Sequence, residues 1–155
     1  MPVERLSATA GDFFVSFATG VEAARTRSPA SRTSRRSPTS ARAGLSVELE
    51  QAALGHVPPG IEVSIYRIVE EALTNALKHA PGSGVRVRLA RTESSVAIEV
   101  VNGPPHGRRH ISIASGHGLT GLRERVSLYG GTVEARPTAD GGFCLAASMP
   151  VVEAA

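Results

Sequence analysis

The sequence EALTNALKHA, at residues 71–80, decides how the rest of the chain is interpreted. Its apolar residues recur three and four positions apart, which predicts the end of an amphipathic helix. Glu71, Asn75 and Lys78 lie four and three positions apart, so their side chains leave one face of that helix. Together they could supply a base, an oxygen ligand for a hard cation and a positive charge for phosphate oxygens. The alternative is a solvated helix edge, and from this stretch alone the two interpretations are about equal.

A glycine-rich motif, GHGLTGLRERV at residues 116–126, begins 41 residues after Asn75. Glycines at the start of a predicted helix let backbone N–H groups approach an anion, and a helix N-terminus favours negative charge. Lys78 is also the only lysine in the chain, against sixteen arginines, which favours a constrained position. A glycine-rich turn alone is weak evidence. After a helix with the pattern E-x-x-x-N-x-x-K-H, it is strong evidence for a phosphate-binding site.

With these two motifs, residues 44–150 resemble the ATP-binding domain of sensor histidine kinases, in a wider family with gyrase, Hsp90 and MutL. The GHGL and LRERV sequences are most similar to the nitrate-sensor type of kinase. The resemblance implies ATP and Mg²⁺ as cofactors, with Asn75 as the Mg²⁺ ligand, Glu71 as the catalytic residue that orients or deprotonates the acceptor, and Lys78 on a phosphate. His79 would lie near the ribose or phosphates, or alternatively cap the helix end against its dipole.

The segment VNGPPHG, residues 101–107, departs from the family pattern. The family's D-x-G-x-G turn uses its Asp to accept a hydrogen bond from the adenine amino group, and here Asn102 replaces that Asp while Pro104 replaces the first Gly. An Asn oxygen can still accept the bond, but bonds without charge assistance are roughly half as strong. Pro104 removes an N–H and fixes φ, so the turn must differ. We expect weakened or altered nucleotide binding; alternatively, residues 102–104 are simply a turn sequence.

Residues 103–117 match the family's mobile ATP lid in position. Arg108 and Arg109 could reach the phosphates or remain solvated. The resemblance implies that His117 packs or orients the lid and that Gly141-Gly142-Phe143 supports the pocket floor. The residues implied to bind ATP are Asn75, Lys78, His79, Asn102, Arg108, Gly116, His117, Gly118 and Leu119, with Gly121 completing the polyphosphate cradle.

Hydrophobic periodicity predicts the elements of this domain. Leu45–Glu50 alternates as a half-buried strand, and the stripe Ile61, Ile65, Ile68, Ala72, Leu73, Ala76 and Leu77 predicts a helix that ends at Ala80. The remaining predicted elements are strands at Gly84–Arg91 and Ser94–Val101, a helix at Leu119–Tyr129 closed by Gly130, and strands at Thr132–Arg136 and Phe143–Met149. These elements predict a two-layer α/β sandwich, with a mixed, mostly antiparallel sheet and helices on one face.

The first 43 residues differ in composition from this domain. Residues 1–24 show a weak helical pattern, and residues 25–43 are a segment rich in Arg, Ser and Pro that we expect to be disordered. That segment could tether nucleic acid, but without interleaved aromatic residues a solvated linker is the better interpretation, so nucleic acid is an unlikely partner. The domain covers residues 44–150, and residues 151–155 form a tail.

Bulk composition limits the class of protein further. From residue 45 onward the chain has ten basic and eleven acidic residues, so the basic pI of 9.7 comes from the Arg-rich segment. No apolar run approaches the ~18 residues of a membrane span, and Glu4 and Asp12 argue against a signal peptide. The single cysteine, Cys144, is expected to be a small buried hydrophobe. We expect a cytoplasmic protein.

The positions of the histidines decide between mechanisms. A histidine kinase carries its phosphoacceptor His on a helical hairpin before the ATP-binding domain, yet no His precedes His56 here. We therefore expect phosphoryl transfer from ATP only in trans, to a His on a partner kinase in a response-regulator pathway, by a monomeric protein. The alternatives are a non-catalytic or truncated ATP-binding or interaction module, and a stand-alone Ser/Thr kinase of the anti-sigma-factor type.

Overall fold

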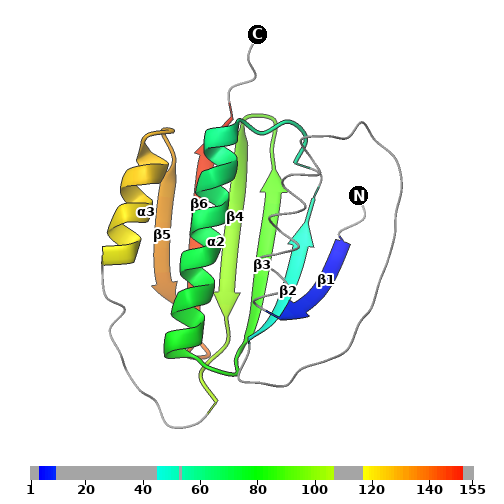
Figure 1. Cartoon of the computed structure of the whole chain (residues 1–155), viewed down its shortest axis with the longest axis vertical. Helices are drawn as coiled ribbons and strands as arrows, with labels where there is room; N and C mark the ends of the chain where they lie inside the picture. The colour runs from blue at the N-terminus through cyan, green and yellow to red at the C-terminus, as the bar shows by residue number, and fades with distance from the viewer. Residues whose placement is uncertain (1–3, 10–44, 53, 107–116, 152–155) are drawn as a thin grey trace.

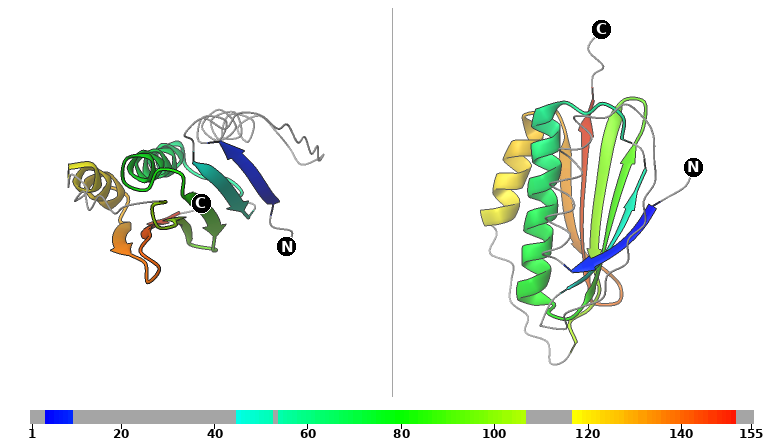
Figure 2. Two further views of the ribbon diagram at one scale, coloured as in Figure 1. Left: turned by 90° about the horizontal axis from the view of Figure 1, so that it is seen from below. Right: turned by 45° about the vertical axis from the view of Figure 1, so that its right-hand side comes forward.

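The computed structural model describes residues 4–9, 45–52, 54–106 and 117–151. They form one six-stranded sheet, with two helices on one of its faces (Figures 1 and 2). The elements in chain order are β1 (Glu4–Thr9), β2 (Ser46–Gln51), α2 (Pro59–His79), β3 (Gly84–Arg91), β4 (Ser95–Asn102), α3 (His117–Ser127), β5 (Thr132–Pro137) and β6 (Phe143–Pro150). The predicted two-layer α/β architecture is confirmed.

The sheet has the strand order β1-β2-β3-β4-β6-β5. Only β2 and β3 are parallel, and α2 provides the crossover connection that parallel neighbours require. All other neighbouring strands are antiparallel. The predicted hairpin between β3 and β4 is confirmed, although β4 begins at Ser95 rather than Ser94, because the Thr92 N–H donates to Ser95 O across the turn.

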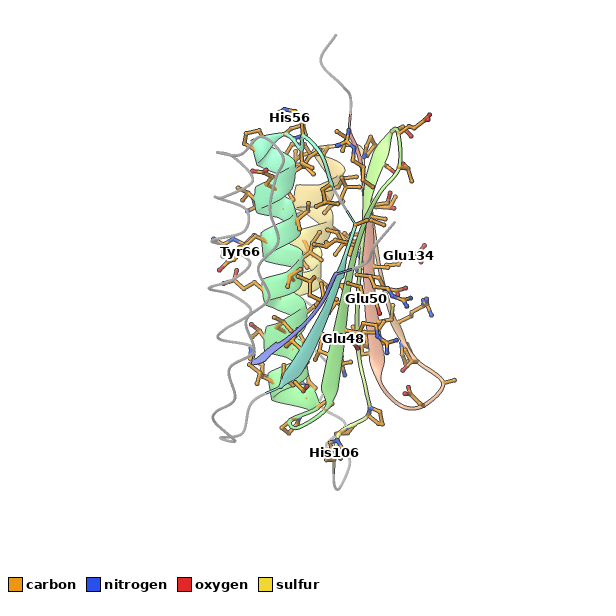
Figure 3. All side chains as sticks on the ribbon, turned by 90° about the vertical axis from the view of Figure 1, so that its right-hand side faces the viewer. Glu48, Glu50, His56, Tyr66, His106 and Glu134 are labelled. Atoms are coloured by element: carbon orange, nitrogen blue, oxygen red, sulfur yellow. The ribbon has the colours of Figure 1, made fainter. Side chains whose placement is uncertain are left out.

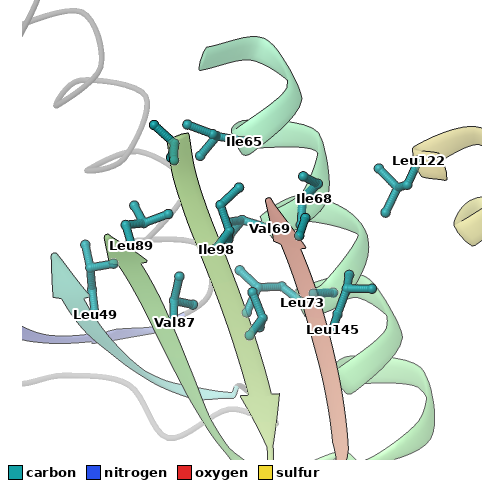
Figure 4. Packing of buried hydrophobic residues seen from close by; sticks show 14 of the residues in the cluster. Leu49, Ile65, Ile68, Val69, Leu73, Val87, Leu89, Ile98, Leu122 and Leu145 are labelled. Atoms are coloured by element: carbon teal, nitrogen blue, oxygen red, sulfur yellow. The ribbon is translucent and has the colours of Figure 1, made fainter. Parts of the chain in front are cut away.

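Helix α2 is the central element of the helical layer. Pro59 lies in its first turn, where a missing N–H costs no hydrogen bond. The predicted stripe is buried from Ile61 to Ala76 against the sheet (Figure 4), but its last member, Leu77, is 40% exposed. The prediction for Leu77 was wrong because a rotation of about 100° per residue carries this position beyond the buried face.

Helix α3 begins and ends two residues before the predicted range Leu119–Tyr129. It buries Leu122 and Val126 and packs against α2 and β5. Gly130, with φ of 69°, follows the helix as the predicted C-terminal glycine. A Cβ on the next residue, Gly131, would collide with Ser148 O and Val126, so a glycine is needed to turn the chain directly into β5.

The first described segment corrects a prediction. Residues 4–9 form β1, an antiparallel partner of β2 with Leu6 opposite Leu49, so the helical pattern expected there is wrong. Pairing with a strand about forty residues away overrides the weak local pattern. The predicted linker at residues 25–43 lies outside the described residues. No helix within the described ranges is long and apolar enough to cross a membrane.

The face of the sheet opposite the helices carries alternating charges. Glu48, Glu50 and Glu134 point away from α2 in Figure 3. Arg88 Nε lies 2.7 Å from Glu50 Oε2, and this hydrogen bond raises the pKa of the guanidinium further above its ordinary value.

Cys144 is buried, as predicted, and its burial raises the pKa of the thiol. The thiol therefore stays protonated and unreactive at neutral pH.

Candidate nucleotide site

The C-terminal end of α2 and the end of β4 lie at one end of the molecule, the lower end in Figure 1. The start of α3 lies above that end, beside α2. The ends of β3 and β4 are joined by the Gly103 N–H, which donates to Gly84 O at 2.9 Å. The end of the motif at residues 71–80 and residues 101–103 therefore lie at the same end of the fold, whereas residues 117–118 approach α2 at Glu71.

Glu71 and Asn75 interact directly on the last turns of α2. Asn75 Nδ2 donates to Glu71 Oε1 at 3.1 Å, and both side chains are half-buried. The spacing of four residues predicted that they share a face, and this contact confirms it. Because the bond uses the nitrogen of the Asn75 amide, the amide oxygen Oδ1 is left to coordinate a cation.

The Glu71 carboxylate also lies against the first turn of α3. A Cβ added to Gly118 would collide with Glu71 Oε1, so the glycine leaves room for this carboxylate beside α3, and a larger residue would displace the Glu71 side chain. Glu71, Asn75 and Gly118 thus form one cluster. Sequence reasoning proposed Gly118 for the polyphosphate cradle and missed its contact with Glu71, since that contact depends on how two helices pack.

These donors are suitable for Mg²⁺. Mg²⁺ prefers oxygen ligands and is commonly held by one or two protein groups together with substrate phosphates. Asn75 Oδ1 and the neighbouring Glu71 carboxylate are groups of that kind, on a rigid helix. Within the described residues, no group of three or more His, Cys, Asp or Glu side chains is placed to hold a metal ion.

The other predicted residues of α2 and α3 have different environments. Lys78 is exposed and His79 is half-buried. His79 Nδ1 is itself buried and has no hydrogen-bond partner. Leu119 packs against the hydrophobic core, and His117 is the first residue of α3. Arg108, Arg109 and Gly116 lie outside the described residues.

Asn102 is the last residue of β4, opposite Val85 of β3 and Phe143 of β6. Its Nδ2 donates to Gly103 O at 2.9 Å. Gly142 is buried against it, since a Cβ on Gly142 would collide with the Asn102 backbone oxygen. The glycine motif of residues 141–143 therefore lies next to the backbone of Asn102.

Asp140 holds the turn that carries Gly142. Thr138 Oγ1 donates to Asp140 Oδ1 at 2.5 Å, and the Gly142 N–H donates to the same oxygen at 3.2 Å. The Thr138 bond is the larger reason that the pKa of Asp140 lies below its ordinary value. The two strands predicted on either side of residues 137–142 implied this turn, but the hydrogen bonds of Asp140 were not predicted, although Thr-x-Asp-Gly is a typical turn composition.

Two hollows lie on the face of the sheet away from the helices. One of about 460 Å³ is lined by Ala90, Ala97 and Ala146 among others, and one of about 310 Å³ reaches Asn102 and Gly103. Neither is lined by Glu71 or Asn75. The Glu71–Asn75–Gly118 cluster therefore lies outside both hollows.

Residues 60–153 match the family described as histidine kinase-, DNA gyrase B- and HSP90-like ATPase. The chain belongs to this family. Its matched segment is an ATP-binding domain of the histidine kinase type, as the two sequence motifs implied.

Two of the similar curated proteins are sensor histidine kinases. YxjM of Bacillus subtilis is 32% identical over 113 residues, which are 72% of this chain and 27% of that protein. The oxygen sensor NreB of Staphylococcus carnosus is 35% identical over 94 residues, which are 60% of this chain and 27% of that protein. The chain spans about a quarter of the length of these curated relatives. The nitrate-sensor subfamily stays a prediction.

Solved structures support the fold. The histidine kinase AdeS of Acinetobacter baumannii matches with a TM-score of 0.58 at 9% identity, over 97% of this chain and 69% of that one. The histidine kinase domain of the blue-light activated kinase of Erythrobacter litoralis EL346 matches with a TM-score of 0.56 at 20% identity, over 71% and 53% of the two chains. At these identities the similarity concerns the fold alone.

Proposed function

We propose that the chain is the Mg²⁺- and ATP-binding catalytic part of a two-component sensor histidine kinase, which transfers the γ-phosphoryl group of ATP to a His side chain of a partner. The observation that carries this proposal is the hydrogen bond between Asn75 and Glu71, made where α3 approaches α2 at Gly118. A carboxylate and an amide oxygen beside a helix N-terminus are the groups that positioning of a triphosphate requires.

Each residue of the cluster has a separate part in this reaction. Asn75 Oδ1 would hold Mg²⁺, which when bound offsets negative charge on the phosphate oxygens. Glu71, fixed by the Asn75 amide, would orient the acceptor imidazole and accept its proton. Lys78, exposed on the last turn of α2, would contact a phosphate. Asn102 Oδ1 would accept a hydrogen bond from the adenine amino group.

The wider setting of the protein belongs to the same proposal. A histidine phosphorylated in this way would pass its phosphoryl group to a response regulator, and both steps would take place in the cytoplasm. We propose that the chain itself is monomeric. A non-catalytic nucleotide-binding module is the second candidate, favoured by the uncharged Asn102, whose amide nitrogen already bonds Gly103 O.

Calorimetric titration with ATP, with and without Mg²⁺, tests the proposed function. Asn75→Ala should weaken Mg²⁺–ATP binding by at least about 10- to 100-fold, the loss already caused by mutating outer-shell groups of metal sites. The ATP affinity of this variant should no longer depend on Mg²⁺. Thr74→Ala, its half-buried neighbour on the same helix, is the control and should bind like the wild type. Equal binding by wild type and Asn75→Ala would refute the metal site.

Asn102→Asp tests the base contact. The charged acceptor should strengthen the hydrogen bond to adenine by roughly 1 kcal/mol, which is about a 5-fold gain in ATP affinity. The same change removes the Nδ2 bond to Gly103 O, so the free protein should have a lower Tm. ITP, which lacks the amino group, should show no gain. A gain that is equal for ATP and ITP would argue against an adenine contact.

A further inference from the structure

Only two polar side chains within the described residues are buried, and they differ in their hydrogen bonding. Ser64 is fully buried, and its Oγ donates to Gly60 O at 2.9 Å within α2. Ser83 is 1% exposed, and its Oγ has no hydrogen-bond partner. Buried hydroxyls are paired in almost all proteins, since burial without a partner costs free energy. Ser83 therefore needs an explanation that Ser64 does not.

The position of Ser83 points to the nucleotide site. It lies one residue before β3, and its N–H donates to Ala80 O, so it follows the turn at the end of α2. Alternation along the chain puts it on the side of Val85 and Val87, which are buried beneath the helices. A Cβ on Gly103 would lie 4.0 Å from Ser83 Cβ, which places Ser83 beside the Asn102–Gly103 end of β4.

A second unpaired atom lies on the same turn. His79 Nδ1, four residues before Ser83, is also buried without a hydrogen-bond partner. Two such atoms flank residues 80–82, between the end of α2 and the start of β3. The Glu71–Gly118 contact, where the phosphates are proposed to bind, involves α3 instead. Ser83, which lies beside Gly103, is therefore on the side of the proposed site where Asn102 is proposed to contact the base.

We propose that the Ser83 hydroxyl is a second polar contact to the purine ring of the bound nucleotide, made directly or through one water molecule. A hydroxyl both donates and accepts, and so can pair with a ring nitrogen, an amino group or a bridging water. The free protein leaves this hydroxyl unpaired, and nucleotide binding pairs it. This inference rests on the proposed function, because it requires that the chain binds a nucleotide.

Ser83→Ala, studied by calorimetry and thermal unfolding, tests the inference. The variant should bind ATP about 5- to 10-fold more weakly, the effect of one lost hydrogen bond. The Tm of the free protein should stay the same or rise, because an unpaired hydroxyl contributes nothing to the fold. Ser64→Ala is the matched control: it removes a paired buried hydroxyl, so it should lower the Tm and leave the ATP affinity unchanged.

A comparison of ATP with UTP locates the contact. If Ser83 contacts the purine, Ser83→Ala should reduce the ratio of ATP affinity to UTP affinity by the same 5- to 10-fold factor. An equal loss for both nucleotides would overturn the purine contact, as would wild-type ATP affinity in Ser83→Ala. A lower Tm of the free variant would show that the hydroxyl is already paired without nucleotide, and would also overturn it. Absence of ATP binding by the wild-type chain would instead refute the proposed function.

Discussion

Replacing Glu71 with Gln should reduce phosphoryl transfer about 10²- to 10⁴-fold, the usual contribution of a positioned general base. Affinity for Mg²⁺–ATP should stay close to that of the wild type, because the Gln side-chain oxygen can still accept the hydrogen bond from Asn75 Nδ2. Packing against Gly118 should also be preserved, since Gln and Glu have the same shape. Transfer of labelled phosphate to a histidine-bearing hairpin supplied in trans measures the first effect, and calorimetry measures the second.

Glu70→Gln is the matched control for this experiment. Glu70 precedes Glu71, but its carboxylate is 2.7 Å from Arg67 in an exposed ion pair on another face of α2. Such surface pairs contribute little to stability, so the control should have wild-type transfer and binding. If the two variants transferred phosphate equally well, Glu71 would not be the base. Absence of transfer by the wild-type chain, with ATP binding retained, would instead make the non-catalytic module the better description.

Elements with strong local patterns could be predicted from the sequence. The stripe from Ile61 to Ala76 fixed α2, and strict alternation fixed β3 and β4 within one residue. β1 could not be predicted, because its pairing with β2 is a contact between distant segments. Leu77 was misplaced for a simpler reason: an apolar residue next to the buried stripe does not have to belong to it.

In the candidate site, too, contacts within one helix could be predicted from the sequence, and contacts between distant segments could not. A spacing of four residues on one helix predicted the proximity of Glu71 and Asn75, and the structure confirms it. The contact of Glu71 with Gly118 and the unpaired hydroxyl of Ser83 involve segments joined only by tertiary packing. No local sequence pattern predicts these contacts, because the burial of a serine depends on which distant segments pack against it.

Gly142→Ala should be among the most destabilising single changes in the domain. Its new Cβ would collide with the backbone oxygen of Asn102 and approach Thr138 Oγ1 to 2.8 Å. The Asn102 oxygen belongs to the backbone of β4 beside β6, so it cannot rotate away as a side chain could. Overpacking typically costs 1–3 kcal/mol. We expect about 3 kcal/mol here, which would lower the Tm by roughly 10 °C.

Gly121→Ala makes the same chemical change as Gly142→Ala, but we expect it to stabilise the domain. Gly121 is exposed within α3, and an added Cβ meets nothing within 4 Å. Replacement of a glycine inside a helix by alanine stabilises by roughly 0.5–1 kcal/mol, so this variant should have a higher Tm.

Because Gly142 lies against Asn102, Gly142→Ala should also weaken ATP binding under conditions in which the variant remains folded. A stable Gly142→Ala protein with wild-type ATP affinity would show that this glycine does not support the proposed adenine pocket.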